Sequence, residues 1–141
     1  MRVRVVTAGS SGTAPDGGGT SGTSVYNMQL SGNQEVPANT SPATASVKVM
    51  LDRTTGAVTV SGSFNNLTSN ATVAHIHGPA AVGSNADVLI PLIVPSATSG
   101  TVSGSGTMDV THMNDMIGGM TYVNIHSMMF PNGEIRAQIT P

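Results

Sequence analysis

The chain has 141 residues and a formal net charge of −2, and only 9% of its residues are charged while 38% are hydrophobic. Five thinly spread basic residues argue against nucleic-acid recognition by a basic patch, and no apolar run approaches the roughly 20 residues of a membrane-spanning helix. The absence of cysteine excludes disulfides and thiolate metal sites. Low charge with abundant Ser, Thr, Gly and Asn is typical of an extracellular or cell-surface β-protein.

The first 24 residues differ in composition from the rest of the chain. Residues 7–24 are almost entirely Gly, Ser, Thr, Ala, Pro and Asp, which is the composition of a flexible linker that is too poor in apolar groups to fold alone. Before this linker, charged and apolar residues alternate, which predicts a short β-strand. We therefore expect an N-terminal strand on a flexible arm (1–24), followed by one folded domain (25–141). The residues of this strand are Arg2, Val3, Arg4, Val5 and Val6.

Beyond the arm, short stretches of alternating apolar and polar residues are separated by turn residues, which predicts a series of β-strands. Pro91 and Pro95 restrict their strand to a sheet edge or a bulge, because proline cannot donate a ladder hydrogen bond. The last two strands form a hairpin with Pro131, Asn132 and Gly133 at its tip. Strands are expected over residues 46–51, 57–64, 73–77, 88–94, 120–127 and 134–139.

One short helix is expected over residues 111–119, with Thr111 as its N-cap and a stripe of apolar side chains along one face. Together, seven to eight strands and one helix predict an all-β fold, an immunoglobulin-like β-sandwich. Its core is expected to be aliphatic, because the chain has only two Phe and two Tyr. The helical stripe consists of Met113, Met116, Ile117 and Met120, and the strand residues expected in the core are Val47, Val49, Val58, Val60, Ile76, Val123, Ile125, Ile135 and Ile139.

Three of the four histidines lie in two of the predicted strands. His75 and His77 belong to Val-Ala-His-Ile-His-Gly-Pro (73–79), and His126 ends Tyr-Val-Asn-Ile-His (122–126). Because alternate side chains of a strand share a face, the three imidazoles meet if the two strands are neighbours. Neutral imidazole is a common ligand of copper and zinc, so the pattern predicts a site for one of these metals. The alternative is a structural cluster of hydrogen-bonded histidines.

Two further residues are candidates to support the histidines. In a hairpin that turns at 128–132, His126 pairs with Glu134, and Asn124 pairs with Arg136. A carboxylate at Glu134 or the amide of Asn124 can fix the orientation of a ligating imidazole. The alternative for Glu134 is a surface ion pair with Arg136 or Lys48, worth ~0–1 kcal/mol.

Methionines offer a second candidate metal site. His112 with Met113, Met116, Met128 and Met129 would suit copper(I), which favours thioether ligands. The helical spacing of the methionines before residue 121 favours core packing instead. Met128, Met129 and Phe130 fall in a predicted loop, where exposed apolar side chains often mark a contact surface.

Four ordered sequence blocks resemble the CHRD domain, a family named after chordin. The blocks are Leu-Ser-Gly-Asn-Gln-Glu-Val-Pro (30–37), Ala-His-Ile-His-Gly-Pro-Ala (74–80), Tyr-Val-Asn-Ile-His (122–126) and Pro-Asn-Gly-Glu-Ile-Arg-Ala-Gln-Ile (131–139). The resemblance covers residues 25–141 and implies a secreted or cell-surface all-β domain. It implies little about chemistry.

We expect a non-enzymatic extracellular or cell-surface module that associates with itself, because no nucleophile elbow or phosphate-binding loop is present. A short strand on a long arm can pair with a sheet edge of a neighbouring copy, and head-to-tail donation makes a filament. The alternatives are a copper- or zinc-binding protein with a redox or superoxide-related role, and a module that binds another protein. Glycosylation is a further hypothesis, at the acceptor sequons of Asn39, Asn66 and Asn70.

Overall fold

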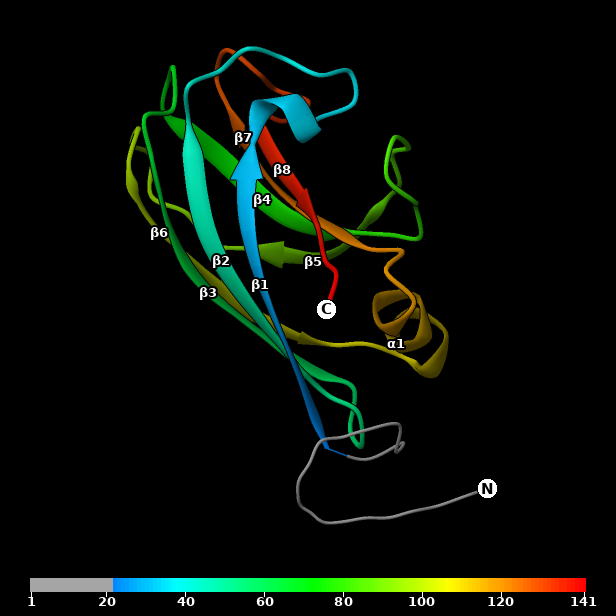
Figure 1. Cartoon of the computed structure of the whole chain (residues 1–141). Helices are drawn as coiled ribbons and strands as arrows, with labels where there is room; N and C mark the ends of the chain where they lie inside the picture. The colour runs from blue at the N-terminus through cyan, green and yellow to red at the C-terminus, as the bar shows by residue number, and fades with distance from the viewer. Residues whose placement is uncertain (1–21) are drawn as a thin grey trace.

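The computed structural model describes residues 22–141, so the predicted arm strand at residues 2–6 lies outside the described residues. The described chain forms eight antiparallel strands, a short 3-10 turn and one α-helix (Figure 1). The elements are β1 (Thr23–Ser31), η2 (Gly32–Gln34), β2 (Thr44–Asp52), β3 (Ala57–Asn65), β4 (Ala71–His77), β5 (Val88–Leu92), β6 (Gly100–Thr107), α1 (Val110–Ile117), β7 (Tyr122–Ser127) and β8 (Ile135–Gln138).

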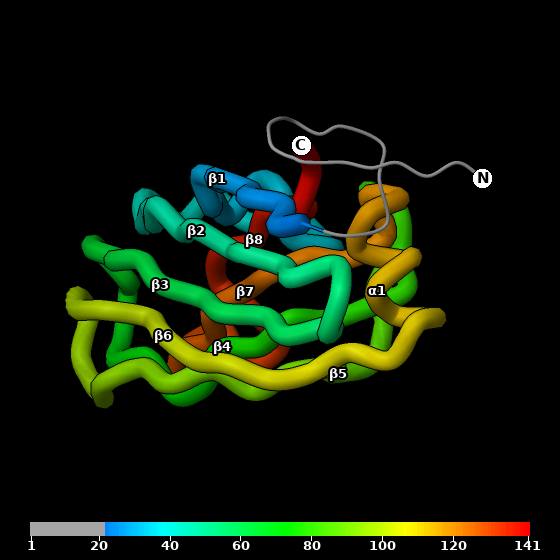
Figure 2. The backbone as a smooth tube through the Cα atoms, turned by 90° about the horizontal axis from the view of Figure 1, so that it is seen from below, coloured from blue at the N-terminus to red at the C-terminus, as the bar shows by residue number. Residues whose placement is uncertain are grey.

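The strands form one continuous sheet in the order β5-β4-β7-β8-β1-β2-β3-β6. Figure 2 shows the sheet curling round so that β3 and β6 lie over β4 and β5. Within residues 22–141, the two ends of the sheet share one bridge, between Ile93 and Ser103. The predicted all-β sandwich of seven to eight strands with one short helix is therefore confirmed, and its two layers are halves of a nearly closed barrel.

The core follows the alternation of the sequence. Along β2 every second residue is buried, and the cross-strand pair Val49 and Val60 places two aliphatic side chains together inside the barrel. Ile76 and Val123 form an equivalent pair between β4 and β7. All nine strand residues predicted for the core are buried: Val47, Val49, Val58, Val60, Ile76, Val123, Ile125, Ile135 and Ile139.

β5 is an edge strand, as its proline predicted, and Pro91 pairs with His75 of β4. The glycine-rich segment that becomes β6 carried little strand signal, yet it pairs with β3 along its whole length. Two of its glycines explain the close approach of β5. A Cβ on Gly104 would lie 2.8 Å from Leu92 Cδ2, and one on Gly106 would lie 3.2 Å from three carbons of Ile90. The side chains of β5 thus fill the space left by these glycines.

The helix prediction was right in place and wrong at its cap. Asp109 is the N-cap of α1, and its Oδ1 accepts a hydrogen bond of 2.8 Å from the backbone N–H of His112. Thr111 lies inside the first turn. The apolar stripe is buried only in part, because Met116 packs in the core while Ile117 and Met120 are exposed.

Replacing Asp109 by alanine is expected to cost about 1 kcal/mol of unfolding free energy, because a free N–H at the helix start loses its acceptor. Thr111→Ala is the matched control, and it should change stability by less than half of that amount. Chemical unfolding of the two variants beside wild type measures both values. Equal losses would contradict the assignment of the cap.

Candidate metal-binding site

The pairing of β4 with β7 places the predicted histidines on one face of the sheet. His75 lies opposite Asn124, and His77 lies opposite Tyr122. Their neighbours along the strands, Ala74 and Ile76, point into the barrel and are fully buried. The local sequence thus produces the site, because alternation sends aliphatic residues inward and imidazoles outward.

The three imidazoles converge, as the sequence predicted. One ring nitrogen from each of His75, His77 and His126 lies within 4.8 Å of those of the other two. His75 Nδ1 is 3.3 Å from His126 Nε2. The ring centroid of His75 lies 5.2 Å from that of His77 and 5.0 Å from that of His126.

Backbone carbonyls hold two of the rings in place. His77 Nδ1–H donates to Ala86 O at 2.9 Å, and His126 Nδ1–H donates to Pro131 O at 2.8 Å. In these tautomers both Nε2 atoms carry a lone pair. The two Nε2 atoms lie 2.9 and 3.0 Å from Oδ1 of Asn124, so Asn124 contacts both rings.

Burial keeps the three histidines neutral. It lowers the pKa of His75 to about 4, with a further contribution from the charges of His126 and His77. Burial also lowers the pKa of His77 and of His126, against the opposing effect of their hydrogen bonds to backbone carbonyls. At neutral pH all three rings therefore offer lone pairs, which is the form that binds a metal ion.

His77, Tyr122 and Arg136 form a stack of side chains at one side of the site. The ring of His77 lies parallel to that of Tyr122, with centroids 4.7 Å apart, and the guanidinium of Arg136 lies 3.6 Å from the centre of the Tyr122 ring. Arg136 is fully buried and donates to Oδ1 of Asn85 at 3.1 Å and to Oε1 of Gln138 at 3.0 Å. Such contacts limit the freedom of the His77 ring.

The position predicted for Glu134 is wrong. Its fully buried carboxylate accepts hydrogen bonds from Ser41 Oγ, Thr68 N and Oγ1, and Ser127 Oγ, so its partners are neither a histidine nor Lys48. Burial raises its pKa, but these hydrogen bonds outweigh that effect and hold the pKa below its usual value. Glu134 precedes β8 in a bend, so strand alternation does not set its direction. Its carboxylate links the loops that contain Ser41 and Thr68 to the β7–β8 hairpin.

Glu35 is the carboxylate beside the site, and no sequence pattern had singled it out. It is 6% exposed, and its Oε2 has no hydrogen-bond partner among the described residues. A Cβ on Gly133 would lie 2.4 Å from Glu35 Oε2 and 2.7 Å from Asn124 Nδ2, so these two atoms flank the same glycine. Burial raises the pKa of Glu35 to about 7, although Arg136 and Asn124 act to lower it.

In a comparison with family models, the CHRD domain model matches residues 26–139. The chain belongs to the CHRD domain family. The match includes the three histidines, Asn124 and Glu35, and nearly all of the described chain. CHRD domains occur in secreted proteins. In the same comparisons, no curated protein and no solved structure matches the chain.

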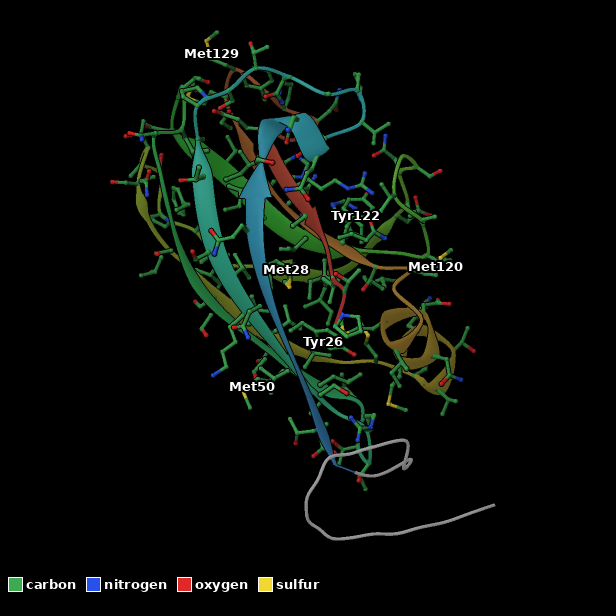
Figure 3. The ribbon with its side chains drawn as sticks, viewed as in Figure 1. Tyr26, Met28, Met50, Met120, Tyr122 and Met129 are labelled. Carbon is green, nitrogen blue, oxygen red and sulfur yellow. The ribbon has the colours of Figure 1, made fainter. Side chains whose placement is uncertain are left out.

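The second candidate site does not form in the CHRD domain. His112 lies on α1, whereas Met129 lies at the opposite end of the molecule (Figure 3). The copper(I) site, over which the helical spacing favoured core packing, therefore does not form with His112 and Met129 together, because these residues are far apart. Met128 and Met129 are 69% and 68% exposed, which agrees with their predicted loop position.

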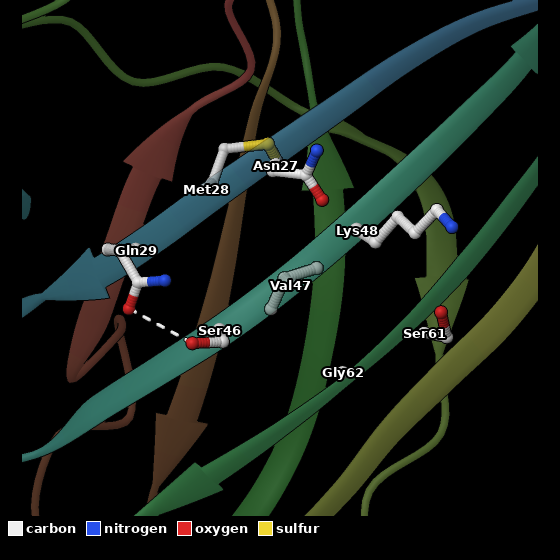
Figure 4. Close-up of a pocket in the computed structure, with 8 residues that line it drawn as sticks. All are labelled: Asn27, Met28, Gln29, Ser46, Val47, Lys48, Ser61 and Gly62. Atoms are coloured by element: carbon white, nitrogen blue, oxygen red, sulfur yellow. Dashed lines mark hydrogen bonds between the residues drawn. The ribbon is translucent and has the colours of Figure 1, made fainter.

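The outer face of β1, β2 and β3 carries a shallow depression that is lined mainly by polar residues and includes none of the histidines (Figure 4). Ser46 Oγ donates to Gln29 Oε1 at 3.0 Å across it, and Lys48 is its one charged lining residue. This composition offers no chemistry comparable to that of the histidines. None of the helices within residues 22–141 is long and apolar enough to cross a membrane.

Proposed function

We propose that this CHRD domain is an extracellular module that binds Cu²⁺ or Zn²⁺ through His75, His77 and His126, without itself being an enzyme. The observation that carries this function is the convergence of three neutral imidazole nitrogens within 4.8 Å. Imidazole suits both metals, and two of the rings are already oriented by backbone acceptors.

The half-exposed His75 provides the entry to the site, since His77 and His126 are buried. Three imidazoles leave at least one coordination position for water or an external ligand. With Zn²⁺ the site would serve binding or stability, and with Cu²⁺ it would also permit one-electron chemistry. Measurements with each ion separate these two roles.

His75→Ala is the sharpest test, because its ring has one hydrogen-bond contact among the described residues, to His126. Removing it deletes a ligand and leaves the backbone-bonded rings in place. We expect the affinity for the preferred ion to fall at least about tenfold, measured by calorimetric titration with Zn²⁺ and Cu²⁺ at neutral pH.

His112→Ala is the matched control, since His112 lies on α1 away from the site. Its affinity for either ion should equal that of wild type. Equal binding by wild type and His75→Ala would contradict the site, as would a complete lack of binding by wild type. Circular dichroism checks that each variant remains folded.

Self-association by donation of the N-terminal strand is a second candidate function, and the two edge strands of the sheet favour it. β5 and β6 end the sheet, and an edge strand can pair with an added strand, although a strand added between them would have to displace the contact of β5 with the glycines of β6. Residues 2–6 have the alternation of such a strand, and the linker after them reaches at most ~60 Å at ~3.3 Å per residue.

Truncation tests this assembly directly. A chain that begins at Gly22 keeps β1 complete, including the backbone bond from Arg53 N to Gly22 O, and removes the arm. We expect the full chain to form oligomers or filaments and the truncated chain to be monomeric in light scattering. A full-length Val3→Asp/Val5→Asp variant keeps the arm's length and should also be monomeric. Assembly of the truncated chain to the same size as wild type would contradict strand donation.

A further inference from the structure

The amide of Asn124 faces a conflict of hydrogen-bonding roles. Each of His77 and His126 has one ring nitrogen against a backbone carbonyl and the other against Oδ1 of Asn124. A neutral imidazole carries one N–H and can donate to only one of these two oxygens. Since the N–H groups point at the carbonyls of Ala86 and Pro131, two Nε2 lone pairs face an oxygen that is also an acceptor.

Two states remove the conflict. In a metal-bound site the Nε2 lone pairs are directed at the cation, and the negative end of the amide dipole is correctly placed toward it. In a metal-free site the amide is turned over, so that the two hydrogens of its Nδ2 serve the two Nε2 atoms, one each. The amide of Asn124 thus has a preferred direction in each state.

The far end of the amide meets Glu35. A Cβ on Gly133 would lie 2.7 Å from Asn124 Nδ2 and 2.4 Å from Glu35 Oε2, so the two polar atoms lie close together over this glycine. When Nδ2 faces Glu35, it donates to an ionised carboxylate. When the amide is turned over, its oxygen faces Glu35, and only a protonated carboxyl can donate to it.

We propose that Asn124 is a two-position amide that couples metal binding at the histidines to the proton on Glu35. This inference rests on the proposed metal site. In the metal-free protein Glu35 is protonated and donates to the amide oxygen. When a divalent ion binds, the amide turns, Nδ2 donates to Glu35, and the proton of Glu35 passes to solvent. One cation is bound and one proton is released, and the new carboxylate interacts with Arg136.

The surroundings of Glu35 suit this role. Among the described residues, the one charged group that acts on it is Arg136 of β8, and the others are the amide of Asn124 on β7 and the backbone of Val36. Burial raises its pKa to about 7. Near pH 6 Glu35 is therefore a buried carboxyl that still holds a proton to release.

The test is a calorimetric count of released protons with Zn²⁺ near pH 6, in two buffers of different ionisation enthalpy and weak metal affinity. Wild type should release about one proton for each ion bound. Glu35→Gln should bind Zn²⁺ and release almost none, since glutamine can serve either direction of the amide without a proton. Asp115→Asn, on α1, is the matched control and should release as many protons as wild type.

A measurement on wild type alone keeps the test independent of the variant's folding. Proton release should disappear near pH 9, where Glu35 is already ionised, and the infrared band of a protonated carboxyl should be lost when Zn²⁺ is added near pH 6. Metal binding without proton release in wild type, or equal release by Glu35→Gln, overturns the coupling and leaves the metal site standing. A failure of wild type to bind any metal overturns both.

Discussion

Replacing Glu35 by glutamine is expected to stabilise the metal-free domain by about 3 kcal/mol above pH 8 and to change its stability little below pH 4. The folded state raises the pKa of Glu35 from 4.5 to about 7, so it holds this proton more tightly than the unfolded state. Because a tenfold change in proton affinity corresponds to about 1.4 kcal/mol, the stability of wild type falls by about 3 kcal/mol as the pH rises through this window. Glutamine has no charge to bury and avoids this loss.

Urea unfolding of wild type and Glu35→Gln from about pH 4 to pH 9 measures the effect. The difference between the two proteins should grow from near zero and level off above pH 8. Asp115→Asn is the control for removal of a carboxylate elsewhere in the domain. A constant offset between wild type and Glu35→Gln would contradict the raised pKa of Glu35.

Replacing Ile125 by alanine is expected to cost ~2–5 kcal/mol of unfolding free energy. Ile125 is 0% exposed and pairs with Ala74 of β4 and Ile135 of β8, so its side chain lies where three central strands meet. Deleting three carbons there leaves a cavity that paired strands on both sides cannot collapse to fill.

Ile125→Val is the matched variant, because it removes one carbon and keeps the β-branch. It should cost ~0.5–1.5 kcal/mol in the same chemical unfolding experiment. A loss below half a kcal/mol for alanine would show that Ile125 does not face the core. The metal affinity of both variants should remain close to that of wild type, since Ile125 points away from the imidazoles.

The convergence of the histidines could be predicted because it depends on strand alternation and on one condition, that β4 and β7 are neighbours. A period of two residues is local, so His75 and His77 share a face in any strand, and the pairing of β4 with β7 adds His126. The same reasoning predicted that Asn124 lies opposite Arg136. It was wrong for Glu134, because a bend intervenes before β8 and sends that carboxylate to Ser127.

Glu35 and Asp109 could not be chosen from the sequence for a different reason. Glu35 follows the η2 turn in a segment without strand or helix periodicity, so nothing local tells which face it covers. Asp and Thr are both favoured at an N-cap, so residue type alone did not distinguish Asp109 from Thr111. Tertiary contacts decided both cases, and no period in the sequence encodes those contacts.

The single bridge between Ile93 and Ser103 has a mechanical consequence. Two backbone hydrogen bonds, of 2.7 and 3.1 Å, join these two segments at the bridge, whereas β3 and β6 pair over eight residues. Under tension, we expect the barrel to open along this line before any continuous ladder breaks. The half that carries the histidines would then swing as a unit with its imidazoles still together, because β4 and β7 lie on the same side of the opening.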